Sequence, residues 1–397
     1  MALPLVPLLG LAAVAVSYNQ RMLDPLTVLI ARDLAVDVTR TIALSPAFTL
    51  PYALGQPFLG PVADSFGKAL VLKLCMAVIA ITTLAAMFVS DDRLLLALRF
   101  VTGLAAGGII PTCLALIADR TPMAERQLTL SRFMVAIIVG QLFTAPVSAA
   151  LAEAFGWRAS PLVAIALASL SMLLLLRGLV PRRDAIRPPF SPRRAVALYR
   201  QILGLPRARA CYVAVAAEGL FVFGFIPHIA VYLSDRGLGG ATEAGYILAG
   251  MGLGGLVHVL IVRWLVRRFD PFTLMIAGSA MLAVGLVSFA LANSWPLMML
   301  SFVILGNGFY LLHTGLQTQV TEILPEARAS LVSLHAFWLF VGIAAGPILF
   351  GWGMALFGVR ATLIASGIAM GLVGTLASRV LRRQVRAFSS EVDAGSR

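Results

Sequence analysis

Long apolar runs recur along this chain, and they constrain its fold more than any other feature. A run of about 18 or more apolar residues is long enough to cross the hydrocarbon core of a membrane as a helix. Of the 397 residues, 60% are hydrophobic and only 12% are charged, whereas a soluble domain carries about 25% charged residues. A membrane β-barrel would show alternating segments of about 10 residues instead. We therefore expect an all-α polytopic membrane protein.

The apolar runs divide into twelve predicted transmembrane helices, whose boundaries carry an uncertainty of a few residues. The predicted spans are 7–31, 40–63, 69–90, 94–118, 128–152, 159–180, 208–233, 241–264, 271–292, 296–319, 329–355 and 360–380.

The charged residues are distributed unequally between the two sides that these spans define. The side with both termini holds 23 Lys/Arg and 9 Asp/Glu, and the opposite side holds 6 Lys/Arg and 7 Asp/Glu. Lys and Arg mark cytoplasmic loops, so we expect both termini in the cytoplasm and the protein in the inner (plasma) membrane. The net charge of +13 is then a topology signal, and we expect no nucleic-acid partner.

The N-terminal apolar stretch from Leu8 to Val16 also has the length of a signal-peptide core. No positive residue precedes it, as a signal peptide would require, so we interpret it as the first transmembrane helix. The three cysteines, Cys75, Cys113 and Cys211, lie isolated within apolar segments. We therefore expect no disulfide framework, no metal site and no cofactor.

The chain repeats itself at a shift of 202 residues. This shift places Pro25 on Pro227 and Gly140 on Gly342, and it aligns FGWR (155–158) with FGVR (357–360). We infer two pseudo-symmetric six-helix bundles in parallel orientation, an arrangement known in transporters that bind substrate between their halves.

The predicted domains are an N-terminal bundle at 1–180, a cytoplasmic linker at 181–207, a C-terminal bundle at 208–381 and a cytoplasmic tail at 382–397. Within the linker, Ser191-Pro192 predicts a helix start and Gly204 its end. Apolar residues recur between them at helical spacing, with arginines on the other side. We expect this amphipathic helix to lie on anionic membrane lipids, although a solvated basic linker is the alternative.

The stretch Gly60-Pro-Val-Ala-Asp-Ser-Phe-Gly-Lys68 lies in the predicted cytoplasmic loop between the second and third helices. It resembles the loop signature of the major facilitator superfamily, Gly-x-Leu-Ala-Asp-Arg-x-Gly-Arg-Lys, with Ser65 and Ala69 in place of two basic residues. Arg99 to Gly107 in the fourth helix is similar to a second family signature. The resemblance covers essentially the whole chain and is closest to the twelve-helix drug:proton antiporters, including sugar-efflux-like members.

The resemblance implies that Gly60, Asp64, Gly67 and Lys68 form a gating motif, with Asp64 latching the cytoplasmic face against the other half. Independently, Gly60 suits close approach of a neighbouring helix, and Gly67 suits a tight turn. A short turn with solvated charges is the alternative.

Four charged residues lie deep in predicted spans, where an isolated charge costs about 2.5–3.5 kcal/mol. Arg21 and Asp24 are three residues apart and can neutralise each other. Glu218 has no charged neighbour within a turn, and because burial disfavours the charged form of a carboxyl group it suits reversible proton uptake. The resemblance implies a proton-transfer or cavity role for Arg99. We regard all four as proton-coupling candidates, with structural roles as the alternative.

A polar stripe on the tenth helix predicts one wall of a central cavity, because polar groups facing lipid cost free energy. Four histidines also lie within spans, at 228, 258, 313 and 335, and each suits packing as well as proton transfer. The substrate-cavity candidates are Tyr18, Tyr52, Gln56, Asn307, Tyr310, His313, Thr314, Gln317 and Trp338.

The sequence contains no phosphate-binding loop and no catalytic cluster, so we expect a transporter that is neither ATP-driven nor an enzyme. The resemblance implies a monomeric secondary transporter that exports a small organic molecule in exchange for protons. In the fifth helix, however, the chain reads Gly140-Gln-Leu-Phe-Thr-Ala-Pro146 and lacks most glycines of the antiporter pattern. An uptake permease and a non-transporting membrane sensor are therefore the alternatives.

Overall fold

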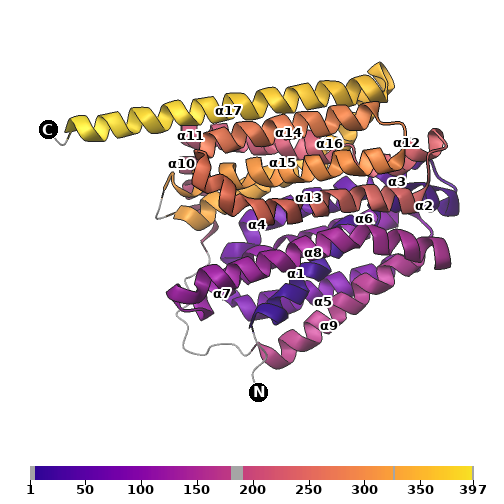
Figure 1. Cartoon of the computed structure of the whole chain (residues 1–397). Helices are drawn as coiled ribbons and strands as arrows, with labels where there is room; N and C mark the ends of the chain where they lie inside the picture. Colours follow the sequence, from indigo (N-terminus) through magenta and orange to yellow (C-terminus); the bar gives the residue numbers. More distant parts are fainter. Residues whose placement is uncertain (1–4, 180–190, 325–326, 396–397) are drawn as a thin grey trace.

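The computed structural model describes residues 5–179, 191–324 and 327–395. In these ranges the chain is helical and has no strand (Figure 1). The elements are α1 (Leu5–Arg21), η1 (Asp24–Leu26), α2 (Thr27–Leu34), α3 (Val38–Ile42), α4 (Leu44–Phe66), α5 (Lys68–Met87), α6 (Asp92–Gly107), α7 (Ile109–Arg120), α8 (Met123–Phe155), η2 (Trp157–Ala159), α9 (Ser160–Gly178), α10 (Pro192–Gly204), α11 (Pro206–Phe223), η3 (Ile226–His228), α12 (Ile229–Asp235), α13 (Ala241–Arg268), α14 (Pro271–Leu291), α15 (Trp295–Thr321), α16 (Arg328–Phe357) and α17 (Val359–Gly395).

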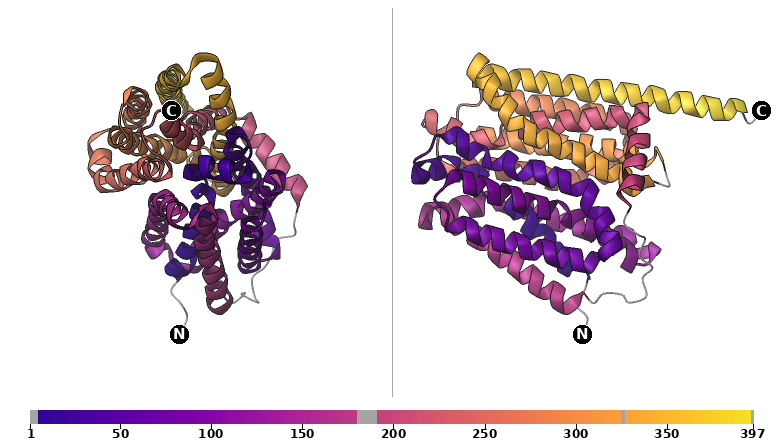
Figure 2. Two further views of the ribbon diagram at one scale, coloured as in Figure 1. Left: turned by 90° about the vertical axis from the view of Figure 1, so that its right-hand side faces the viewer. Right: turned by 180° about the vertical axis from the view of Figure 1, so that it is seen from behind.

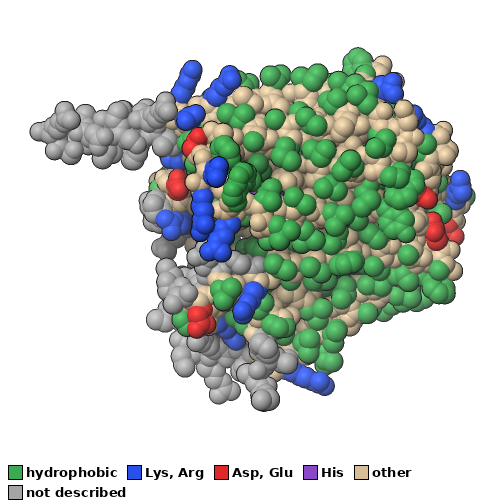
Figure 3. Space-filling model, viewed as in Figure 1, with side chains coloured by type: hydrophobic (Ala, Val, Ile, Leu, Met, Phe, Trp, Pro, Cys, Tyr) green, Lys and Arg blue, Asp and Glu red, His purple; other side chains and the backbone are tan. Residues whose placement is uncertain are grey.

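Ten helical stretches in the described ranges are long and apolar enough to cross a membrane. The other two predicted spans are also helical: the first is divided among α1, η1 and α2, and the second corresponds to α4, which has Pro51, Pro57 and Pro61 in its interior. Large apolar side chains such as Leu260 and Phe357 are more than 70% exposed on the outer face, and apolar side chains cover much of the face in Figure 3. The predicted all-α polytopic fold is confirmed.

The two halves of the chain form two bundles, which Figure 2 shows side by side in the end-on view. Their packing repeats at the same shift as the sequence. Gly140 of α8 lies against Val14 of α1, and Gly342 of α16 lies against Ala216 of α11, 202 residues further on. A Cβ atom at Gly342 would lie 2.0 Å from the Ala216 carbonyl oxygen, so only glycine permits this approach.

Proline breaks the first helix of each bundle at equivalent positions. Pro25 lies in η1 and Pro227 lies in η3, where the missing N–H and the fixed backbone angle interrupt the helical hydrogen bonds. The two breaks meet, because the Thr27 hydroxyl donates to the Pro227 carbonyl at 3.4 Å. The broken helices thus join the bundles near the end of the molecule opposite α10.

The bundles also contact each other along two pairs of long helices. Gly245 and Gly252 of α13 lie against α8, and a Cβ atom at Gly252 would lie 2.8 Å from Leu142. On the other side, the Tyr52 ring of α4 lies 4.4 Å from the Phe340 ring of α16.

Lys and Arg side chains gather at one end of the bundles, on the left in Figure 3. Helix α10 lies at this end, and α17 extends beyond it (Figure 1). The predicted linker stretch 181–190 lies outside the described residues, and the side chains of 385–397 are likewise not described.

The linker helix α10 forms over the predicted residues. Ser191 is at the N-cap position and its side chain makes no capping hydrogen bond. Ile202 is fully buried, and Leu198 and Leu203 pack with it on the core of the C-terminal bundle. Part of the apolar face of α10 therefore packs on protein, whereas Val196 is 43% exposed. Contact of α10 with membrane lipids stays a prediction.

The glycines of the loop at 60–68 have different roles. Gly67 has a φ of 107°, a region that favours glycine, and so permits the tight turn between α4 and α5 as predicted. The expected close approach at Gly60 was wrong, because a Cβ atom there would meet nothing within 4 Å. On α4 it is Gly55 that lies close to another helix, with a Cβ position 2.8 Å from the Leu104 carbonyl.

Candidate functional site

A buried acid–base pair lies in the C-terminal bundle. Glu218 of α11 is fully buried, and its Oε2 lies 2.9 Å from Nδ1 of His313 on α15. The neighbouring Gly219 brings α16 against this point of α11, with a Cβ position 2.2 Å from the Leu339 carbonyl. Glu218 has no exposed surface, and the His313 ring is its hydrogen-bond partner among the described residues.

His335 of α16 extends this pair to a third titratable group. Its ring lies 4.9 Å from the His313 ring, and the residue is almost completely buried. Both of its ring nitrogens and Oε1 of Glu218 lack a hydrogen-bond partner among the described residues. Unpaired buried polar atoms are rare and costly. Glu218, His313 and His335 thus bring three titratable side chains together in the C-terminal bundle.

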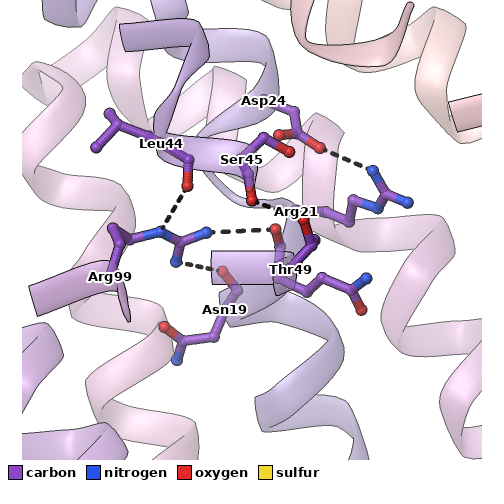
Figure 4. A network of polar contacts seen from close by, with 8 residues as sticks. Asn19, Arg21, Asp24, Leu44, Ser45, Thr49 and Arg99 are labelled. Atoms are coloured by element: carbon purple, nitrogen blue, oxygen red, sulfur yellow. Dashed lines mark hydrogen bonds and ion pairs between the residues drawn. The ribbon is translucent and has the colours of Figure 1, made fainter. Parts of the chain in front are cut away.

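Arg99 holds the broken end of α1 in the N-terminal bundle. The last carbonyls of a helix have no helical donor, and α1 ends at Arg21. Arg99 donates to the Asn19 carbonyl at 2.8 Å and to the Gln20 carbonyl at 3.4 Å, and also to Leu44 (Figure 4). Its guanidinium lies 4.4 Å from the Phe48 ring centroid. Arg99 is thus positioned as a cap of the break rather than as a free charge.

A small cavity of about 10 Å³ adjoins this cap. Its lining includes Asn19, Thr83, Arg99 and Trp157, and Nδ2 of Asn19 has no hydrogen-bond partner among the described residues. A cavity of this volume holds about one water molecule.

Arg21 and Asp24 form the predicted pair at the same break, with Nη1 and Oδ2 3.2 Å apart. In Figure 4 this pair points away from the Arg99 guanidinium. Arg21 also lies 4.8 Å over the Phe223 ring of α11. The pair therefore touches the opposite bundle, where a movement between the bundles would change its surroundings.

Several of the predicted cavity residues lie where the two bundles face each other. Tyr310 of α15 donates to Gln141 of α8 at 3.0 Å, and Thr314, one turn further, is exposed. Tyr52 contacts Phe340 of the opposite bundle. The carbonyl of Gln56 accepts from the Ser333 hydroxyl of α16 at 3.1 Å. Gln317 is partly exposed on the same helix as Tyr310.

Two other predicted cavity residues are buried within their own bundles, and a third is partly buried. Tyr18 is buried within the N-terminal bundle, with its hydroxyl 3.3 Å from the Ser160 hydroxyl of α9. Asn307 is buried where α15 packs on Gly254 of α13. Trp338 is partly buried, and its indole N–H has no hydrogen-bond partner among the described residues. The stripe on the tenth predicted helix did not distinguish the packing position of Asn307 from the positions that face the other bundle.

The cytoplasmic loop is tied to its own bundle. Nζ of Lys68 lies 3.2 Å from Asp64 and 2.6 Å from Asp119 at the end of α7. Lys68 thus bridges a carboxylate of the loop and one that follows the fourth predicted span. Contact of Asp64 with the other half stays a prediction.

Sequence reasoning named Glu218 and His313 separately and did not foresee their contact, because 95 residues separate them. It also missed Gln141, which accepts a hydrogen bond from Tyr310 of the other bundle, and Ser333, which donates to the Gln56 carbonyl of the other bundle. Neither belongs to a periodic polar stripe, so the sequence carries no signal for them.

Comparisons with known proteins identify the family. The sequence profile described as Major Facilitator Superfamily matches residues 9–335 and, in a second match, 242–395. The chain belongs to the major facilitator superfamily. As expected, it is a multi-pass membrane protein of a family of transporters.

The names of individual relatives indicate different substrates. The chain is 28% identical to the 4-hydroxybenzoate transporter PcaK of Pseudomonas aeruginosa, over 61% of this chain and 60% of that protein. It is 28% identical to a gallate transporter of Pseudomonas putida, over 82% and 77%. It is 25% identical to the multidrug efflux pump LfrA of Mycolicibacterium smegmatis, over 83% and 77%.

A solved structure shares the fold. The nucleoside transporter NupG, crystallised as a point mutant, superposes with a TM-score of 0.78 at 13% identity, over 95% of this chain and 100% of that chain.

Proposed function

We propose that this protein is a proton-coupled secondary transporter that exports a small organic solute by alternating access, with its two bundles rocking about a central site. The observation that carries this proposal is the contact of Glu218 with His313 in the C-terminal bundle. Membership in the superfamily supports transport, and the buried pair supports the coupling to protons.

The pair suits coupling because it holds one proton between two groups of different type. Without a further proton, the pair is a carboxylate against an imidazolium or a neutral acid against an imidazole. A further proton leaves the pair with a net positive charge in a water-poor core, a state that is stable only when the surroundings change. A solute bound at the nearby bundle interface, where Tyr310 contacts Gln141, would change the surroundings of the Glu218–His313 pair.

A second candidate function is uptake of an aromatic acid together with protons. It is favoured by the relatives that are named as 4-hydroxybenzoate and gallate transporters. The efflux candidate has support from the relative named as a multidrug efflux pump.

The two directions are distinguished in membrane vesicles with an imposed pH gradient. Radiolabelled 4-hydroxybenzoate and gallate, and the dye ethidium, serve as probes. Accumulation in inside-out vesicles with an acidic lumen indicates antiport, whereas accumulation in right-side-out vesicles in an acidic medium indicates symport. In both cases we expect Glu218→Gln to abolish gradient-driven accumulation. Flux that is indifferent to an uncoupler would refute proton coupling.

The topology and assembly belong to the same proposal. We propose bundles at 1–180 and 208–381, joined by the linker 181–207 and followed by the tail 382–397, with both termini cytoplasmic and the protein monomeric. The gathering of Lys and Arg at the α10 end supports this orientation. Protease protection of tags at each terminus in sealed vesicles tests it.

A further inference from the structure

The linker helix α10 contacts both bundles. Ile202 is fully buried, and with Leu198 and Leu203 it anchors α10 to the core of the C-terminal bundle. From the same helix, the Tyr199 hydroxyl reaches α4 of the N-terminal bundle and donates to the Pro57 carbonyl at 2.9 Å. This single bond connects a helix fixed to one bundle with a helix of the other.

The acceptor of this bond lacks its ordinary helical donor. In an α-helix the carbonyl of residue 57 accepts the N–H of residue 61. Residue 61 is Pro61, inside α4, and proline has no N–H. The Pro57 carbonyl therefore needs a donor from outside its helix, and Tyr199 supplies it.

The same segment of α4 is held from a second side. The Gln56 carbonyl accepts from the Ser333 hydroxyl of α16 at 3.1 Å, and the Ser333 side chain also interacts with the Tyr199 phenol. Two consecutive carbonyls of α4 thus bind groups that belong to, or are anchored on, the C-terminal bundle. Directly after this segment, the last turns of α4 lead to the turn at Gly67 and then to Lys68 of α5.

We propose that Tyr199 is a positioning residue of the cytoplasmic gate, holding α4 and its loop against the C-terminal bundle when the cytoplasmic side is closed. Because α10 is fixed to the C-terminal bundle, separation of the cytoplasmic ends must break the bond to Pro57. The bond therefore favours the cytoplasm-closed state over the cytoplasm-open state. This inference rests on the alternating access of the proposed function, but not on its substrate or its protons.

The test is the alkylation rate of a reporter cysteine in membrane vesicles. Thr314→Cys places the reporter at an exposed position beside the bundle interface, and the native Cys75, Cys113 and Cys211 are buried. N-ethylmaleimide is the probe. A hydrogen bond of ordinary net strength shifts a two-state ratio by roughly 2- to 12-fold. We expect Tyr199→Phe to raise the alkylation rate within that range, and an unchanged rate would overturn the proposal.

Tyr212→Phe is the matched control. The Tyr212 hydroxyl donates to the Leu331 carbonyl at 3.2 Å, but both residues belong to the C-terminal bundle. This variant loses the same type of hydrogen bond but no contact between the bundles, so we expect its alkylation rate to equal that of the parent. An equal rise in both variants would overturn the proposal, since it would indicate general loosening.

A second comparison distinguishes two possible roles of Tyr199. It either holds the two bundles together or only donates a hydrogen bond to the Pro57 carbonyl, which lacks a donor within α4. Pro61→Ala restores the N–H that Pro57 lacks within α4. We expect Tyr199→Phe to raise the alkylation rate in this background as well. If the rise disappears, Tyr199 only satisfies an unpaired carbonyl, and the gating role is refuted. The alkylation rates do not depend on proton-coupled flux, which is measured in a separate assay. If the proposed proton coupling is wrong, the alkylation rates therefore still test the role of Tyr199.

Discussion

His313 is the residue on which the buried acid of the C-terminal bundle depends. It contributes the group within hydrogen-bond distance of Glu218, and removing one partner of a buried pair leaves the other charge uncompensated. We predict that His313→Asn lowers proton-driven transport at least about tenfold, because each 1.4 kcal/mol changes a rate or an equilibrium tenfold. Counterflow driven by solute alone should persist, and transport assays in liposomes measure both.

His228→Asn is the control for this prediction. His228 is also buried in the C-terminal bundle, but its Nε2 lies 3.0 Å from the Pro347 carbonyl rather than from a carboxylate. Proton-driven transport should survive this change. Equal losses in the two variants would show that any buried histidine is required for structure, and the coupling role of His313 would be wrong.

Arg99 shows how a single residue stabilises a helix break. It reaches carbonyls of α1 and α4 with three different nitrogens, a geometry that the point charge of lysine does not reproduce. We predict that Arg99→Lys lowers the free energy of unfolding by about 1–3 kcal/mol, the cost of buried carbonyls that lose their donors. Thermal unfolding of the purified protein measures this loss. Arg93→Lys, an exposed position on the same helix, should leave the stability unchanged.

Asp33 ties the end of α2 to the connection between α8 and α9. The Trp157 indole N–H donates to its carboxylate at 3.0 Å, and Arg158 forms an ion pair with it. The hydrogen bonds from Trp157 and then Arg158 lower the pKa of Asp33 below its ordinary value. Because the pKa is lowered in the folded state, the stabilisation is present above about pH 4 and is lost as the pH falls further.

The prediction concerns the pH profile of stability. Asp33→Asn should unfold at a lower temperature than the parent at pH 7, by a few degrees at most because the carboxylate is 43% exposed. The difference should shrink as the pH falls below about 4. A difference that stays constant between pH 7 and pH 3 would show that the charge of Asp33 contributes nothing.

At the scale of helices, glycines decide how closely the elements pack. Gly342 permits α16 to touch α11, where a Cβ atom would lie 2.0 Å from a backbone oxygen that cannot move aside. We predict that Gly342→Ala lowers the free energy of unfolding by about 1–3 kcal/mol, the usual cost of overpacking. Gly60→Ala is the matched control, because its added methyl group enters open space. Similar losses in both variants would contradict the packing argument.

The helices themselves could be predicted from the sequence, whereas most contacts between them could not. Apolar length and the repeat predicted the spans, but not the helix breaks at Pro25 and Pro227, which lie inside two of the predicted spans. The approach of Glu218 to His313 depends on the rotation of α11 and α15 about their axes. Packing fixes that rotation, and spacing within one helix does not report it. For the same reason the stripe on α15 grouped buried Asn307 with exposed Thr314.

At the scale of the whole molecule, the two bundles are joined at several depths. Thr27 meets Pro227 at the helix breaks, Tyr310 meets Gln141 between the bundles, and Ser333 meets Gln56 nearer α10. Each is a single hydrogen bond between uncharged groups, worth about 0.5–1.5 kcal/mol. Such bonds break and re-form at low cost, which suits two bundles that must rock against each other.

The charges around the turn between α4 and α5 pair within one bundle in this structure, whereas the proposed gate acts between bundles. Asp64 and Asp119 both contact Lys68, at 3.2 and 2.6 Å, and both are about half exposed. If pairing with Lys68 were the whole role of Asp64, Asp119→Asn should harm transport at least as much as Asp64→Asn, since its contact is shorter. We predict instead that Asp64→Asn lowers transport several-fold more than Asp119→Asn, without preventing membrane insertion. Surface ion pairs contribute only about 0–1 kcal/mol, so a larger loss at Asp64 requires a partner that it meets in another conformation. Transport rates normalised to the amount of inserted protein decide the question, and equal rates in the two variants would exclude such a partner.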